Sequence, residues 1–185
     1  MKPINSDCKK HNLSTAKECA LISVFVSLVI SAQIILSAVP GVEIVTVLFV
    51  VYSYVCGAKR GMISATAFSL LRQIIFGFFP TVLVLYLIYY NMLTLIFGLI
   101  GKRIKYSIKW LPIIVMIACF CTVFFTMIDN VLTPIWYGYS KKATKLYFIA
   151  SLPFVASQVI CTAVSVSCLF IPLYKAFKTV YKIEN

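Results

Sequence analysis

Long apolar stretches separated by short polar breaks are the main pattern along this chain. A polar, basic segment over residues 1–17 precedes the first stretch, and Pro, Gly or Lys/Arg clusters end most of the stretches. A helix needs about 20 apolar residues to cross a bilayer, and several stretches approach or exceed that length. We therefore predict an all-α integral membrane protein with six transmembrane helices, over residues 20–39, 42–56, 62–79, 82–100, 111–132 and 146–174.

Two parts of the pattern depart from a simple row of spans. The helix expected over 42–56 is short for a full span, so its outer end should contact protein rather than lipid. Thr133-Pro134 should end the fifth helix, and a polar and aromatic connection over residues 134–145 is expected to follow. The last helix should be longer than the bilayer or kinked at Pro153 and Pro172.

The composition also indicates a membrane protein. Of the 185 residues, 62% are hydrophobic and 12% are charged, whereas soluble domains carry about 25% charged residues. These values exclude a cytosolic globular protein, and the abundant apolar surface excludes disorder. The chain is too short for more than one domain, so residues 1–185 are expected to form a single transmembrane domain.

The net charge of +12 arises from 17 Lys and Arg against five Asp and Glu. The basic residues cluster at the ends of apolar stretches, so they indicate membrane topology and argue against nucleic acid as a partner. One face of a six-span arrangement would hold most of them, including both ends of the chain. The other face would hold only Lys141, Lys142 and Lys145. By the positive-inside rule, we expect a multi-pass protein of the cell membrane with both termini in the cytoplasm.

Strongly polar side chains within the expected spans share one depth, from the outer half to the middle. They are Glu43, Arg72, Gln73, Asn91, Asp129, Asn130 and Gln158. Such groups are costly in a bilayer and usually face a cavity or a partner, so we expect a solute cavity open to the outside. Arg72 would attract a carboxylate or phosphate, while Glu43 and Asp129 would accept hydrogen bonds. Alternatively, Arg72 reaches the interface or pairs with Glu43 or Asp129 as a structural tie.

Aromatic and small residues add two further candidate surfaces. Phe76, Tyr86 and Tyr90 lie at the depth of the polar residues, where their rings would stack on a planar ligand. Trp136, Tyr137 and Tyr139 are expected in the last external loop, where an interfacial aromatic belt is the alternative. Ser23, Ser27 and Ser31 recur every four residues on the first helix. Small residues at this spacing let another helix approach, either within this protein or on a partner subunit.

Catalytic and metal-binding patterns are absent from the sequence. The one histidine lies in the basic tail, which excludes an intramembrane His-based triad, and no phosphate-binding Walker loop occurs. The seven cysteines lie mostly within apolar stretches and form no C-x-x-C pair, so they are interpreted as small hydrophobic residues. We therefore expect no enzyme activity, no metal and no cofactor.

Three short motifs lie at the ends of the expected helices. The first is a Pro-containing external loop after the first helix, from Ser31-Ala32-Gln33 through Pro40-Gly41-Val42-Glu43. The other two are the turns Gly57-Ala58-Lys59-Arg60-Gly61 and Phe76-Gly77-Phe78-Phe79-Pro80. Together they resemble the substrate-binding S components of energy-coupling factor (ECF) vitamin transporters, which have such a loop, a G-x-K-x-G turn and a further external turn at these places. The family's A-x-x-x-A docking motif on the first helix is here replaced by the serines.

The resemblance implies a six-helix bundle that binds a vitamin-like solute in its outer half. It also implies three partners besides membrane lipid, namely a transmembrane coupling subunit and two ATPases that drive uptake. Other functions stay open: a membrane scaffold similar to the rod-shape-determining D protein, a self-sufficient small-solute transporter, or a small lipid-modifying enzyme. The enzyme would need a nucleophile and base within reach, and no such pair is evident. A self-sufficient transporter would need polar residues along a whole path.

Overall fold

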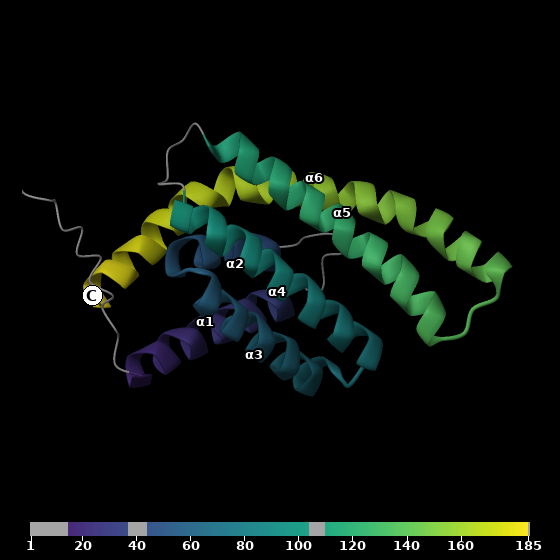
Figure 1. Ribbon diagram of the computed structural model, residues 1–185, viewed down its shortest axis with the longest axis horizontal. Coiled ribbons are helices and arrows are strands. Elements are labelled where there is room, and N and C mark those ends of the chain that lie inside the picture. Colours follow the sequence, from purple (N-terminus) through teal and green to yellow (C-terminus); the bar gives the residue numbers. More distant parts are fainter. Residues whose placement is uncertain (1–14, 37–43, 104–109, 185) are drawn as a thin grey trace, which may run out of the picture.

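The computed structural model describes residues 15–36, 44–103 and 110–184, which form six α-helices and no strand (Figure 1). The helices are α1 (Thr15–Leu36), α2 (Ile44–Cys56), α3 (Ala58–Phe76), α4 (Pro80–Arg103), α5 (Leu111–Trp136) and α6 (Lys141–Glu184). The predicted all-α class is therefore confirmed.

Within the described ranges, four segments are long and apolar enough to cross a membrane. They are Ala16–Leu36, Pro80–Arg103, Leu111–Trp136 and Lys141–Val180. α2 is apolar but has only 13 residues, which is about 20 Å at the helical rise against a bilayer core of about 30 Å. α3 carries Lys59, Arg60 and Arg72 within its 19 residues. The helices are thus those expected of a membrane protein.

α2 lies at the centre of the bundle, in contact with α1, α3, α4 and α6 (Figure 1). Every residue from Val45 to Tyr54 is buried. The ring of Phe49 packs edge-on against Phe25 and Phe68, each at 5.3 Å between centroids. A helix that is apolar on all sides is buried on all sides. This central position explains how so short a helix stays inside the protein.

Two glycines of α4 let this helix pack closely against the end of α2 and the start of α3. A Cβ added to Gly98 would lie 2.3 Å from the backbone nitrogen of Ala58. One added to Gly101 would lie 2.1 Å from the carbonyl oxygen of Tyr54. Gly57 joins α2 to α3 with φ +89°, a conformation that favours glycine. The G-x-K-x-G turn is therefore pressed directly against α4.

α5 and α6 form a long hairpin that extends beyond the other four helices (Figure 1). The predicted connection over residues 134–145 is wrong, because α5 continues through Pro134 to Trp136 and α6 begins at Lys141. Ser140 explains the early start, since its side-chain oxygen accepts a hydrogen bond from the Ala143 amide at 3.3 Å. α6 then runs for 44 residues with two prolines inside it, which confirms that it is longer than a bilayer span.

The starts of α1 and α3 are joined by an ion pair. Arg60 Nη2 donates to Glu18 Oε1 at 2.7 Å, and Arg60 Nε donates to the same oxygen at 3.3 Å. Both helices begin earlier than predicted, at Thr15 and Ala58. Part of the predicted basic tail and part of the predicted Gly57–Gly61 turn are therefore helical. Charged side chains are tolerated at the ends of membrane helices, whereas they are costly inside apolar spans.

Candidate functional site

A row of hydrogen bonds joins α5 to α6. Thr122, Thr126 and Asn130 recur every four residues on α5 and so share one face. The Thr122 and Thr162 hydroxyls lie 3.1 Å apart, Thr126 Oγ1 donates to Gln158 Oε1 at 3.2 Å, and Asn130 Nδ2 donates to Ser151 Oγ at 2.8 Å. We call these three contacts the polar ladder. Interhelical hydrogen bonds of this kind hold membrane helices together.

A groove of about 330 Å³ opens beside this ladder, between α5 and α6. Its polar wall consists of Thr126, Asp129, Ser151 and Gln158. Its other lining residues are Phe125, Tyr147, Ala150 and Phe154. A concave surface that is mostly apolar with a few convergent polar groups is typical of a small-molecule site. We call it the α5–α6 groove.

Asp129 is held in place at the groove by two hydroxyl donors. Thr133 Oγ1 donates to its Oδ1 at 2.8 Å, and the Tyr147 hydroxyl donates to its Oδ2 at 2.9 Å. Asp129 lies seven residues before the end of α5, which is about 10 Å at the helical rise. The carboxylate is therefore inside a membrane-competent helix and yet faces polar partners.

The other predicted site residues on α3 and α4 form a separate group. The Arg72 guanidinium lies over the rings of Phe76, at 5.1 Å, and Tyr86, at 4.5 Å. Its Nε is buried without a hydrogen-bond partner, and no ion pair joins Arg72 to an acid within the described ranges. Contacts with two rings are a cation–π arrangement. Of the two predicted ion-pair partners, Asp129 is engaged on α5 and α6, and Glu43 lies outside the described residues.

The two amides predicted on α3 and α4 make structural contacts. Gln73 Oε1 accepts a hydrogen bond from the Phe79 amide at 2.9 Å, which closes the turn between the helices. Asn91 Oδ1 accepts from Thr66 at 3.3 Å, and its Nδ2 donates to the Leu87 carbonyl at 2.8 Å. These residues brace the α3–α4 pair.

Phe125 lies between the two groups. Its ring is 6.0 Å from that of Tyr86 and 4.6 Å from that of Tyr89, and it also lines the α5–α6 groove. Tyr90, in contrast, is only 5% exposed and packs in the core against Phe49. The structure thus places Asp129 and Gln158 in the α5–α6 groove, whereas Asn130 is buried and bonds to Ser151 beside it. Arg72 and its neighbours lie on the other side of the Phe125 ring.

Several groove residues were not predicted from the sequence. Tyr147 and Ser151 belong to the first turns of α6, and Tyr147 follows closely on the segment that was expected to be a loop. Thr126 had a usable signal, because Thr122, Thr126 and Asn130 are spaced for one helix face. The Phe125 and Phe154 rings carried no signal that separates them from ordinary apolar span residues.

The three serines of α1 lie on its outer face. Ser23, Ser27 and Ser31 are exposed, while Phe25 and Val29 on the opposite face are buried in the bundle. The stripe is therefore not used for packing within the described part of this chain. The interpretation that it packs inside the protein is wrong, and its contact with a partner stays a prediction.

No group of three or more potential metal ligands occurs among the described residues. Comparison of the chain with protein-family models, curated proteins and solved structures finds no match. The groove and its chemistry are therefore the features of the molecule that bear on its function.

Proposed function

We propose that this chain is the solute-binding membrane subunit of an ECF-type importer. It captures a vitamin or a related micronutrient from outside the cell. The observation that carries the proposal is the α5–α6 groove, where a hydrogen-bonded carboxylate, hydroxyls and aromatic rings meet inside two apolar helices. Polar groups at membrane depth that line a hollow are typical of solute sites.

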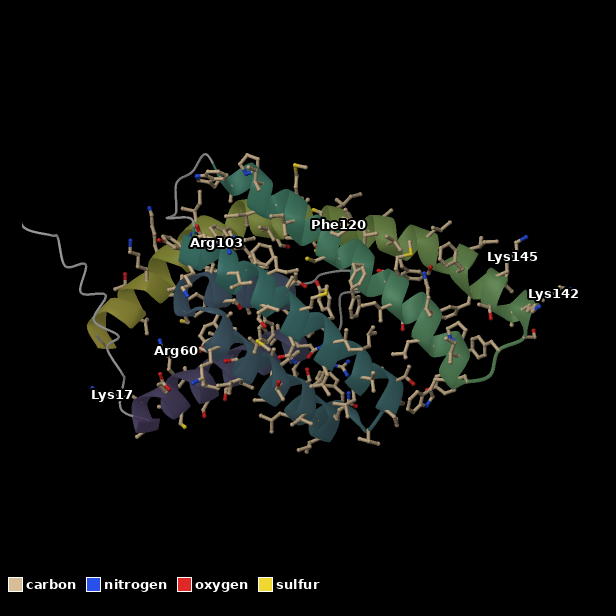
Figure 2. All side chains as sticks on the ribbon, in the orientation of Figure 1. Lys17, Arg60, Arg103, Phe120, Lys142 and Lys145 are labelled. Atoms are coloured by element: carbon tan, nitrogen blue, oxygen red, sulfur yellow. The ribbon has the colours of Figure 1, made fainter. Side chains whose placement is uncertain are left out.

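The proposed orientation follows from the positions of the charges. Lys142 and Lys145 lie at the far end of the α5–α6 hairpin, while Lys17, Arg60 and Arg103 lie at the opposite end of the molecule (Figure 2). The end with more basic residues is proposed to be cytoplasmic. The groove, near the other end, then opens outward. All six helices would lie within the membrane, with α2 and α3 shielded by the longer ones.

Release of the solute is proposed to depend on partner subunits. The chain has no Walker loop, so a coupling subunit and two ATPases would supply the energy. The exposed serines Ser23, Ser27 and Ser31 offer a face on which a helix of the coupling subunit would dock. Lipid would cover the remaining exposed apolar surface.

The test is a census of the small molecules that purify with the protein. The wild type, Asp129→Asn and Phe120→Ala are purified in mild detergent and denatured, and released solutes are identified by mass spectrometry. Phe120 lies on the same helix but is 72% exposed, so its variant is the matched control. We expect one solute in near-equal molar amount in the wild type and control, and depletion in Asp129→Asn. Absence of any solute from all three would refute the proposal.

A non-enzymatic membrane scaffold is the second candidate. The observation that favours it is the polar ladder, in which Thr126 and Asn130 of α5 donate hydrogen bonds to Gln158 and Ser151 of α6. Polar residues that serve only to join helices need no ligand. The same census separates the two functions, because a scaffold releases no stoichiometric solute.

A further inference from the structure

The hydrogen-bonding groups of the α5–α6 groove are not balanced between donors and acceptors. Tyr147 uses its single O–H toward Asp129 Oδ2. Ser151 uses its O–H toward the Phe148 carbonyl at 2.8 Å. A hydroxyl has one hydrogen and two lone pairs. Both groups therefore keep acceptor capacity and have no hydrogen left to donate, although one lone pair of Ser151 already accepts from Asn130 Nδ2.

The hydroxyl hydrogen of Thr126 is also used inside the protein. Its Oγ1 lies 3.3 Å from the Thr122 carbonyl and 3.2 Å from Gln158 Oε1, and both of these atoms are acceptors. The single hydrogen is thus shared between two internal acceptors. Asp129 adds an acceptor-only carboxylate whose oxygens each have room for a further hydrogen bond. Three hydroxyls and one carboxylate therefore present acceptors to whatever occupies the groove, and the Gln158 amide is the one described lining side chain that also carries N–H groups.

The charged side chains in and around the groove also favour a ligand that donates hydrogen bonds. Among the described lining residues, Asp129 is the one charged side chain. Lys141 and Lys145 line a separate hollow with Tyr139 at the start of α6, and Arg72 is stacked on Phe76 and Tyr86. The groove is therefore a negative site with aromatic walls at Phe125, Tyr147 and Phe154. Aromatic faces attract cations.

We infer that the solute bound in the α5–α6 groove is a small organic cation that carries N–H donors, such as an amidinium, an aminoheterocycle or a protonated amine. The inference rests on the proposed solute-binding function and narrows its substrate class. It differs from the expectation that Arg72 recruits a carboxylate or phosphate. Asp129 would bind the cationic head directly, and Tyr147 and Ser151 would accept its other N–H groups.

The test compares three probes with the same phenyl body and different head groups, namely benzamidinium, benzamide and benzoate. Each is titrated onto the full chain in nanodiscs and followed by saturation-transfer NMR, with empty nanodiscs as the blank. We expect benzamidinium to bind about tenfold or more tighter than benzamide, because hydrogen bonds between charged groups are the stronger ones. Benzoate should bind most weakly.

Three variants assign the preference to its source. Asp129→Asn should remove the advantage of benzamidinium, whereas Tyr147→Phe, which keeps the carboxylate, should retain it. Arg72→Gln should change none of the three affinities. The ranking of the probes on the wild type remains informative even if Asp129→Asn does not fold.

Several results would overturn the inference. They are benzoate binding tightest, benzamidinium binding that is insensitive to Asp129→Asn, or no binding of any probe to the wild type. An anionic solute identified in the census would also overturn it but would leave the solute-binding function standing. An empty census would remove that function as well, so the two failures are distinguishable.

Discussion

Replacement of Gly98 by alanine should destabilise the protein, although alanine is the better helix former. Inside a helix, alanine is favoured over glycine by roughly 0.5–1 kcal/mol. The added Cβ, however, would lie 2.3 Å from the Ala58 nitrogen and 2.4 Å from its Cα. These are backbone atoms, so relief requires α4 to move away from the α2–α3 turn by about 1 Å in a closely packed interior.

The magnitude follows from the balance of the two effects. Overpacking of a tight interior costs roughly 1–3 kcal/mol. After subtraction of the gain in helix propensity, Gly98→Ala should lower the free energy of unfolding by about 1 kcal/mol, and by at most about 2.5 kcal/mol. The sign is the informative quantity, because propensity alone predicts the opposite one.

The assay is reversible unfolding in mixed micelles, with SDS as the denaturant and helical circular dichroism as the signal. The control is Leu99→Ala on the same helix, where the leucine side chain is 47% exposed and a change within about 0.5 kcal/mol is expected. Equal or higher stability of Gly98→Ala would refute the close approach of α4 to the Gly57–Gly61 turn.

Two further predictions concern assembly and topology. Ser27→Leu adds bulk to the exposed serine face of α1, so it should abolish co-purification with the coupling subunit and ATPases while the bound solute is retained; Val24→Leu, at a neighbouring exposed position, is the control, and normal assembly of Ser27→Leu would count against docking there. A reporter fused after Asn185 should be active only in the cytoplasm because of the positive-inside rule, and an external signal would reverse the proposed outward opening of the groove.

The helices themselves were predictable because hydropathy records which residues avoid water. Runs of apolar residues between Gly, Pro and Lys/Arg clusters gave all six helices, including the short α2. The boundary of α6 was not predictable from hydropathy. Lys141, Lys142 and Lys145 are polar, and yet they extend the helix because Ser140 supplies the capping contact.

The sequence predicts how far along its helix each candidate site residue lies, but it does not predict which side chains contact one another. A position along an apolar run gives the depth of Arg72 or Asp129, whereas the rotation of each helix decides which side chains meet. Arg72 and Phe76 are four residues apart on one helix and could have been paired from the sequence. The contact between Asp129 and Tyr147 depends on how α5 and α6 pack, which hydropathy does not encode.

The central claim, a solute groove that opens outward between α5 and α6, is tested most directly by thiol labelling in intact cells. The seven native cysteines are replaced, and Ser151→Cys and Phe120→Cys are introduced separately. A small, membrane-impermeant cationic thiosulfonate is then added from outside. Ser151→Cys in the groove should be modified rapidly, whereas Phe120→Cys, which would face lipid, should not be modified. No modification of Ser151→Cys, or modification only after the cells are opened, would contradict the central claim.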